Sequence, residues 1–490
     1  MSTTKVTYSM IDGAPVNVKD FGADPTGATN SVTAINNAII AVSSSGGGTV
    51  YLPQGIYIVS SRIILKRGVS LIGDGMADYS LYPTMKGTTI RPAIGFSDSY
   101  VILADSATDS TTLLSGVGIS DLSIDCINIP ALANRIIGLN SVTNAGIFKN
   151  ISVLNLDDGF ALSLSKSAYS GALPTDGLII EGFFTYGKTA NYSSTRPKLE
   201  VFGSNEITFI GCKFQGLSNA VAGTIAAVVY DLTNSITFQD CAFGGCETGV
   251  QIYDNSGTGS GPRWIRVINC TFETYRYGVW VSASSSNPIY YPARCYFSSN
   301  RFISAVGANC RNYYLDKSIG TYVVADDYVE AGSSGTSYVA ELTTNAQDAT
   351  IWAANNVVSN SSTSSIVVGR NGNAFQVSSL YRQSTVAPTL ATGWSNASPS
   401  NRTSAGYWKD LQGVVHLQGY VGYSSGGSSL IFTLPTGYVP LKAQVLTVTT
   451  NSGVGSILVN QYGSGNDGQI TQLTGGTTWV SLDGISFALN

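Results

Sequence analysis

The fold is decided by four stretches that repeat one pattern: ITFIGCKF at 207–214, ITFQDCAF at 236–243, IRVINCTF at 265–272 and CYFSSNRF at 295–302. The third residue of each is large and apolar, and these anchors are spaced by 29, 29 and 30 positions. The same template extends in both directions with spacings of 27 to 32 residues. The nine anchors are Ile119, Phe148, Ile180, Phe209, Phe238, Val267, Phe297, Val324 and Trp352.

A unit of about 29 residues cannot bury its own apolar face, so successive units have to stack. Three short strands with turns fit this length, and coils stacked at about 4.8 Å form a parallel β-helix with internal ladders of like residues. Cys212, Cys241 and Cys270 each stand three residues after an anchor. We therefore expect them to be a stack of small buried thiols, with disulfide bonds as the lesser alternative.

The composition agrees with an all-β chain and limits its chemistry. Charged residues make up 11% of the sequence, against about 25% in an average soluble domain. The net charge of −4 argues against nucleic acid or an anionic membrane as the main partner. The single histidine, His416, nearly excludes a histidine metal site or a Ser-His triad. Because no acidic cluster has the spacing of a Ca²⁺ loop, we expect no metal and no cofactor.

The N-terminal region has no signal-peptide pattern and the sequence has no run of 18 apolar residues, so we expect no signal peptide and no membrane span. Asn30 or Ser31 can cap a short helix that runs to about Ser43. Gly46–Gly48 would end this helix, and strands follow from Thr49. A helix in this place would cover the open edge of the first coil.

The same region carries a resemblance to a known family. The segments DFGADPTGATNS (20–31), AINNAI (34–39), GGGTVYLPQGIY (46–57) and LIGDG (71–75) resemble the N-terminal signature of the pectate-lyase-like family of phage tailspikes and bacterial exopolysaccharide enzymes. The resemblance implies a right-handed β-helix, a homotrimer on a virion tail with other tail proteins as partners, and action outside the cell. Its members bind, and often cleave, bacterial surface polysaccharide such as capsule, exopolysaccharide or O-antigen.

The repeat fades after residue 360, and the chain continues into short alternating strands. We expect a short N-terminal arm at 1–17, a cap and first coils at 18–110, a β-helix core at 111–365, a linker at 366–404 and a small β-sandwich at 405–490. The last part resembles the C-terminal domains of tail fibres, which implies trimerisation or glycan binding. His416 alternates with Val414 and Gln418, as a packed or solvent-facing strand residue does.

Hydrolysis of a glycosidic bond needs two carboxylates on either side of the bond. Aligning KLEVFG (198–203) with AVVYDL (227–232) places Glu200 and Asp231 on the outer face of neighbouring coils, about 8 Å apart. We expect these two to be catalytic, or else to be scattered surface groups. The outward side chains around them would bind the sugar: Lys198, Gln251, Tyr253, Arg276 and Trp280.

Two alternatives stay open. Asp157–Asp158–Gly159 is similar to the paired-aspartate segment of polygalacturonase-like hydrolases, which makes Asp157 and Asp158 catalytic candidates, although the accompanying Gly-His-Gly is missing and Asp-Gly is also an ordinary turn. A lyase would instead use a base and a cation beside a uronate, with a tyrosine as base and Lys198, Arg196, Arg263 or Arg276 as the cation. The hypotheses are therefore a hydrolytic depolymerase, a lyase of the same fold, and a receptor-binding spike without turnover.

Overall fold

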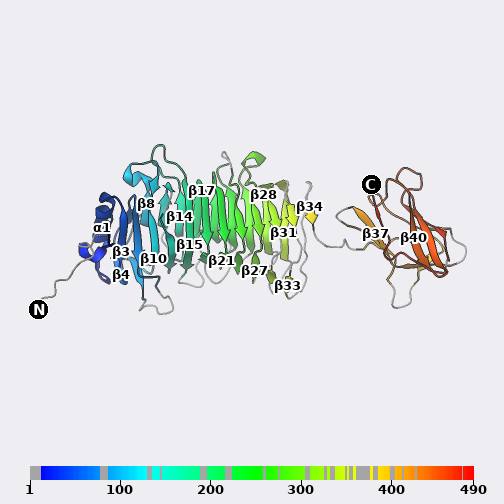
Figure 1. The fold of residues 1–490 in the computed structure, drawn as a ribbon, viewed down its shortest axis with the longest axis horizontal. Coiled ribbons are helices and arrows are strands. Elements are labelled where there is room, and N and C mark those ends of the chain that lie inside the picture. The colour runs from blue at the N-terminus through cyan, green and yellow to red at the C-terminus, as the bar shows by residue number, and fades with distance from the viewer. Residues whose placement is uncertain are drawn as a thin grey trace. The chain divides into compact units, whose positions relative to one another are not determined.

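A computed structural model gives the fold of the chain (Figure 1). It describes all residues except 1–12, 78–85, 130–134, 144–145, 188–195, 216–222, 258–260, 274–275, 304–309, 325–327, 331–336, 348–349, 353–356, 360–375, 379–384, 398–402, 411–412, 425–427, 477 and 490. The chain divides into two compact units, residues 1–376 and 377–490. No helix in the described ranges is long and apolar enough to cross a membrane.

The first unit is a parallel β-helix, as the repeat predicted. Each coil contributes one strand to a ten-stranded sheet and shorter strands to a 24-stranded sheet, and every strand pairs in parallel with its counterpart on the next coil. The ten-stranded sheet consists of β5 (Ile63–Leu65), β8 (Tyr100–Asp105), β11 (Arg135–Asn140), β14 (Phe160–Ser165), β16 (Leu199–Phe202), β19 (Ile225–Tyr230), β22 (Thr248–Asp254), β25 (Tyr277–Ala283), β28 (Cys310–Ile319) and β31 (Ser337–Gln347).

The 24-stranded sheet begins in the N-terminal coils and runs the length of the unit. Its strands are β1 (Val16–Asn17), β2 (Thr26–Asn30), β3 (Gly48–Leu52), β4 (Gly55–Val59), β6 (Val69–Gly73), β7 (Thr88–Pro92), β9 (Leu114–Ser115), β10 (Gly118–Asp125), β12 (Val142–Thr143), β13 (Phe148–Leu154), β15 (Thr175–Tyr186), β17 (Ser204–Ile210), β18 (Lys213–Gln215), β20 (Asn234–Gln239), β21 (Ala242–Gly244), β23 (Arg266–Ile268), β24 (Thr271–Glu273), β26 (Tyr296–Ser298), β27 (Arg301–Ile303), β29 (Tyr322–Val324), β30 (Tyr328–Glu330), β32 (Thr350–Trp352), β33 (Val357–Ser359) and β34 (Gln376–Ser378). Among the described residues, short 3-10 helices lie between strands at η2 (Val18–Phe21), η4 (Ser106–Asp109) and η5 (Pro288–Tyr290).

The interior is built from ladders of like side chains. Phe243 stacks on Phe214 at 5.9 Å and on Phe272 at 5.3 Å, and Phe209 stacks on Phe238 at 5.0 Å (ring centroids). These rings are almost completely buried, and burying such a side chain contributes roughly 1.5–3 kcal/mol. The predicted thiol stack is confirmed, because Cys212, Cys241 and Cys270 are buried and free.

The strand register confirms seven of the nine anchors and corrects two. Phe297 pairs with Val323, and Val323 pairs with Ile351. The interior positions are therefore one residue before the predicted Val324 and Trp352. Side chains alternate between the two faces of a strand, so a slip of one residue exchanges inside for outside.

The N-terminal end is closed by α1 (Val32–Ser44), which packs against β3 and β5. Its apolar side, with Val32, Ile35 and Ile39, is buried on the first coils. The Asn30 side chain accepts a hydrogen bond from the Val32 amide at 3.3 Å, and the helix ends before Gly46 and its neighbours, which have positive φ angles. The predicted cap over the open sheet edge is therefore present.

The family signature has a physical basis in Asp24. Its carboxylate accepts hydrogen bonds from the amides of Thr26, Ala28 and Thr29 and from both threonine hydroxyls. These bonds, above all those from Thr26, hold the pKa of Asp24 well below its usual value. The Asp-Pro-Thr-Gly sequence thus builds a tight turn that leads the chain into β2 and α1.

The second unit is an antiparallel β domain with a sheet of seven strands and a sheet of three. Its strands are β35 (Trp394–Asn396), β36 (Gly406–Lys409), β37 (Val414–Gln418), β38 (Tyr420–Tyr423), β39 (Leu430–Thr433), β40 (Gln444–Thr450), β41 (Gly453–Val459), β42 (Gln469–Thr474), β43 (Val480–Ser481) and β44 (Ser486–Ala488). Strand β35 falls within the predicted linker 366–404 and pairs with β38. His416 stacks on Trp408 at 3.9 Å, and its Nε2 lies 2.9 Å from Asp410.

Candidate functional site

The candidate site lies on the outer face of the ten-stranded sheet. The register aligns one residue from each coil into a column that runs from Ser163 through Glu200, Val228, Gln251 and Trp280 to Tyr314. The preceding residues in these strands, including Leu199, Val250 and Val279, are fully buried in the interior. Because strand side chains alternate, the column faces away from the core.

Glu200 is the centre of a hydrogen-bonded group that we call the Glu200 cluster: Arg135, Ser163, Glu200 and Tyr230. Glu200 Oε2 accepts hydrogen bonds from Arg135 Nε at 2.7 Å and from Ser163 Oγ at 2.8 Å. Its Oε1 accepts one from the Tyr230 hydroxyl at 2.5 Å. The Glu200 side chain is 5% exposed, whereas that of Arg135 is 37% exposed. A ligand therefore reaches Arg135 more easily than Glu200.

The cluster places two hydrogen-bond donors, Arg135 and Tyr230, around one acceptor, the Glu200 carboxylate. Burial and the neighbouring Glu200 raise the pKa of Tyr230 above its usual value, so the phenol keeps its proton. Burial opposes the charged form of Arg135, but the hydrogen bond and charge of Glu200 outweigh it and raise the pKa of Arg135. The guanidinium also lies over the ring of Phe160, at 5.0 Å from its centroid.

The structure does not bring Asp231 beside Glu200. Glu200 pairs with Val228, so Asp231 lies one coil and three residues away instead of one coil and two, about 11 Å in backbone terms. Asp231 Oδ1 instead accepts hydrogen bonds from the amides of Asn255 and Ser256 at 2.6 and 3.1 Å. The predicted alternation in this coil was wrong by one residue, because Val229 is interior and Tyr230 faces outward.

Lys198 also lies differently from the expectation. It is 2% exposed instead of facing outward, and its ammonium donates to the carbonyls of Leu156 and Asp157 at 3.0 and 2.8 Å. Burial lowers the pKa of Lys198. An outward position was expected because the strand was taken to alternate from Lys198 onward, but the strand begins only at Leu199.

The aspartate pair at 157–158 is buried as well. Asp158 forms an ion pair with Arg196 at 2.5 Å, and the Asp158 side chain is 12% exposed. Asp157 is 3% exposed, and its carbonyl holds the Lys198 ammonium. In this structure the Asp158 side chain and the Asp157 carbonyl hold their turn to Arg196 and Lys198 of the next coil.

The predicted sugar-binding residues further along the sheet do face outward. Gln251, Tyr253 and Trp280 are partly exposed, and Trp280 belongs to a group of rings that we call the aromatic platform: Tyr277, Trp280 and Tyr314. The ring centroids of Tyr277 lie 5.2 Å from Trp280 and 5.6 Å from Tyr314. Trp280 Nε1 is buried and has no hydrogen-bond partner in the described part of the chain.

Two arginines border the platform. Arg311 lies over Tyr314 at 4.9 Å and over Tyr277 at 5.4 Å, and Arg276 lies over Tyr277 at 5.4 Å. Arg276 also forms an ion pair with Glu247 at 3.2 Å. Flat aromatic faces beside guanidinium donors suit the rings and carboxylates of an acidic sugar.

The sequence analysis missed Asp254, which lies in register with Asp231 because Tyr230 pairs with Tyr253. Asp254 is fully buried, and its Oδ2 receives no hydrogen bond from a donor in the described residues. Burial, and then the nearby Asp231, raise the pKa of Asp254, as expected for a desolvated carboxyl group near a second carboxylate. The repeated dipeptide Tyr-Asp at 230–231 and 253–254 was the signal for this pair.

The described residues include a pocket away from the ten-stranded sheet but no metal-binding group. Within the described ranges no group of three or more His, Cys, Asp and Glu side chains is placed to hold a metal ion. The C-terminal unit has a pocket of about 240 Å³ lined by Trp394, Tyr423, Ser428, Ser429, Gln472, Leu473, Thr474 and Gly475.

Comparison with known families identifies the first unit. Residues 15–273 match the model of the rhamnogalacturonase A/epimerase, pectate lyase-like family. The chain belongs to this family. Membership agrees with the family that the N-terminal signature had predicted.

The curated relatives match over a short stretch only. Alginate lyase 7 of Azotobacter vinelandii is 39% identical over 116 residues, which is 22% of this chain and 12% of the relative. Mannuronan C5-epimerase AlgE4 of the same organism is 38% identical over 117 residues, 22% of this chain and 19% of the relative. The chain thus spans less than a fifth of the length of the curated relatives it matches.

Solved structures with a similar fold include a bacteriophage protein and an adhesin. Gene product 12 of bacteriophage phi29 aligns over 74% of this chain and 55% of its own, with 13% identity and a TM-score of 0.46. The surface adhesin PfbA of Streptococcus pneumoniae aligns over 71% of this chain and 92% of its own, with 13% identity and a TM-score of 0.45.

Proposed function

We propose that this protein binds a bacterial surface polysaccharide along the outer face of the ten-stranded sheet and cleaves it at the Glu200 cluster. The observation that carries the proposal is the Glu200 carboxylate, hydrogen-bonded to Arg135 and Tyr230 on the outer face that also bears the aromatic platform. Membership of a polysaccharide-active family supports the same conclusion.

The reaction that this chemistry supports best is β-elimination at a uronic acid. Arg135 would approach the uronate carboxylate and stabilise the charge that builds up as the C5 proton leaves. Glu200 would accept that proton, and the Tyr230 hydroxyl would donate a proton to the O4 leaving group. The C5–H and C4–O4 bonds break, a C4=C5 double bond forms, and no water is consumed. The lyase alternative is thus preferred to the carboxylate-pair hydrolase.

Hydrolysis remains the second candidate because of Asp231 and Asp254. A carboxyl group whose pKa is raised can act as the general acid of a glycosidase, and its neighbour can act as the base. Glu200 with Asp231 does not carry this candidate, since the register separates the two.

The experiment uses a panel of acidic capsules, alginate and polygalacturonate, with absorbance followed near 235 nm and products weighed by mass spectrometry. Elimination predicts unsaturated fragments that disappear in Glu200→Gln and persist in the matched control Glu206→Gln, an exposed glutamate of the same coil on β17. Fragments heavier by one water, lost in Asp254→Asn, would favour hydrolysis. If a glycan of the panel binds and no glycan yields products, the result would favour a receptor-binding spike without turnover.

The biological setting is a further part of the proposal. The N-terminal signature resembles that of phage tailspikes, which supports a homotrimer on a virion tail that meets the host surface. Sedimentation equilibrium should then give three times the chain mass of 51.3 kDa. A monomer would contradict the trimer. The C-terminal pocket, with Trp394 and Tyr423 in its wall, supports glycan binding as the role of the second unit.

A further inference from the structure

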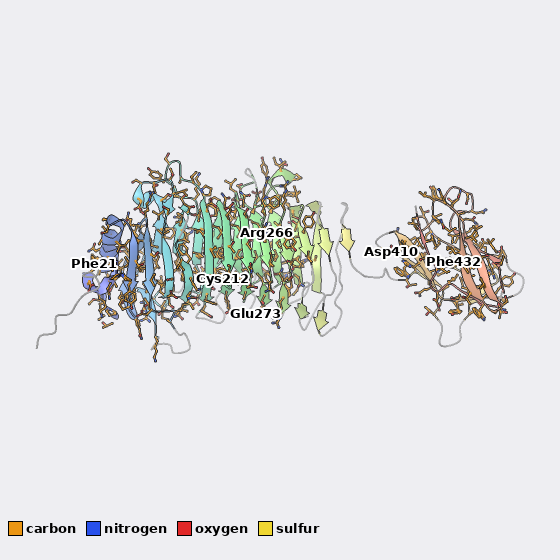
Figure 2. The ribbon with its side chains drawn as sticks, in the orientation of Figure 1. Phe21, Cys212, Arg266, Glu273, Asp410 and Phe432 are labelled. Atoms are coloured by element: carbon orange, nitrogen blue, oxygen red, sulfur yellow. The ribbon has the colours of Figure 1, made fainter. Side chains whose placement is uncertain are left out.

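We propose that the first unit has a second polysaccharide-binding surface, on the coils that follow the Glu200 cluster but on a different side of the β-helix. This inference rests on the proposed function. The surface, which we call the corner ladder, consists of Arg263, Trp264, Arg266, Arg294, Tyr296 and Tyr322, all exposed. Arg266 is labelled in Figure 2. The ladder residues lie on or just before β23, β26 and β29 of the 24-stranded sheet, not on the ten-stranded sheet.

The strand register brings these residues together from three coils. Arg266, Tyr296 and Tyr322 align in one column. Trp264 and Arg294 align in the neighbouring column, since Arg263 bridges to Ala293, and the Arg294 guanidinium lies 4.9 Å from the Trp264 ring centroid. Coils repeat at about 4.8 Å, so the side chains form a continuous strip on the surface.

Trp264 occupies a backbone position that disfavours large side chains. Its φ angle is 59°, in the left-handed region, and the corresponding residues of other coils are Gly177, Glu206, Ser235, Arg294 and Gly320, all with positive φ. A bulky residue pays a conformational penalty there. Burial does not offset it, because Trp264 is 45% exposed. A strained, exposed tryptophan is characteristic of a binding surface.

Charge and exposure identify the ligand class. Arg263, Arg266 and Arg294 form no ion pair with any described residue, although the whole chain has a net charge of −4. Guanidinium groups bind carboxylates through two parallel hydrogen bonds, and the exposed rings of Tyr296 and Tyr322 offer flat faces to sugar rings. The occupant is therefore an acidic polysaccharide. Three arginines on an acidic protein are too few to hold a nucleic-acid backbone.

A second binding surface would strengthen the binding of long polysaccharides and leave the binding of short oligosaccharides unchanged. A polymer that contacts the corner ladder raises its own effective concentration at the ten-stranded face, whereas an oligosaccharide that fills only the Glu200 region gains nothing. The corner ladder should thus affect polymer binding without changing the turnover of short substrates.

The test uses substitutions taken from the preceding coil, which the backbone already accommodates. Trp264→Ser copies Ser235, and Arg266→Thr copies Thr237. The matched control is Glu206→Ser, at the position equivalent to Trp264 two coils earlier. Binding is measured by affinity electrophoresis of the full chain in gels that contain alginate, polygalacturonate or hyaluronate, with neutral dextran for comparison.

The expected result is that an acidic glycan retards the wild type and the control, and that the double variant binds it at least about threefold more weakly. Equal retardation of the double variant, retardation by dextran alone, or stronger retardation by duplex DNA would overturn the proposal. The proposal would also be overturned if the double variant had a different mass in sedimentation but the same retardation. The corner ladder would then be a contact between copies of the chain. Glu200→Gln separates the two proposals, because it removes products and leaves retardation intact.

Discussion

The replacement Tyr230→Phe tests the Glu200 cluster most sharply, because it removes one oxygen atom and leaves the ring. The hydroxyl donates a hydrogen bond to Glu200 Oε1 at 2.5 Å. Its ring packs against Phe202 at 5.1 Å between centroids, and that contact survives the replacement. The change should therefore cost the hydrogen bond alone.

The magnitude follows from the partner's charge. A hydrogen bond to a charged group contributes about 1.5–3 kcal/mol, and Glu200 keeps two other donors, so we expect a loss of about 2 kcal/mol in the free energy of unfolding. If Tyr230 protonates the leaving group, turnover should fall by about 10²–10⁴-fold.

The control is Tyr462→Phe, which makes the same change at an exposed tyrosine of the second unit, outside the proposed site. Urea unfolding followed by circular dichroism gives the stability, and release of products from the polysaccharide gives the turnover. Equal effects of the two replacements, or wild-type turnover in Tyr230→Phe, would refute the assigned role of Tyr230.

Four further predictions concern the core, the pH dependence and the platform. Phe243→Ala should lower the free energy of unfolding by about 3–5 kcal/mol in urea titrations, whereas Phe243→Leu should cost far less; equal costs would contradict the ladder. Gly278→Ala should cost about 1–3 kcal/mol in the same assay, because a Cβ would clash with the Phe302 ring and the Asn312 carbonyl; a neutral result would contradict this packing. The folded-state pKa of Asp254 is raised, so its contribution to stability is complete below about pH 3.9 and is lost as the pH rises through the folded value. Asp254→Asn should therefore reduce the loss of thermal stability between acid and neutral pH relative to the wild type, and an unchanged pH profile would argue against a raised pKa of Asp254 in the folded protein. Trp280→Ala should weaken glycan binding by about tenfold in affinity electrophoresis, and unchanged binding would remove the platform from the site.

The repeat made most of the β-helix predictable. Anchors such as Phe209 and Phe238 are large and buried, and their spacing of 29 residues survives in the sequence because each coil has to fill the same interior. The prediction failed at Val324 and Trp352, where the coil between Phe297 and Val323 is shorter than the template. A ladder is conspicuous in sequence, but its exact register depends on turns that vary in length.

The candidate site was less predictable for the same reason. Glu200, Gln251 and Trp280 were expected to face outward, and they do, because each flanks apolar residues that have to be interior. Asp231 was misplaced because the alternation of its strand was predicted one residue out of phase, and Lys198 because it precedes the start of its strand. Arg135 reaches Glu200 across 65 positions of sequence, and a contact of that kind leaves no local pattern.

The central claim is that the outer face of the ten-stranded sheet cleaves an acidic polysaccharide, and product analysis by mass spectrometry with absorbance near 235 nm tests it most directly. The account predicts unsaturated oligosaccharides from at least one acidic glycan, released by the wild type and by Glu206→Gln but not by Glu200→Gln. A glycan that binds without yielding any fragment, or fragments that Glu200→Gln still releases at the wild-type rate, would contradict it.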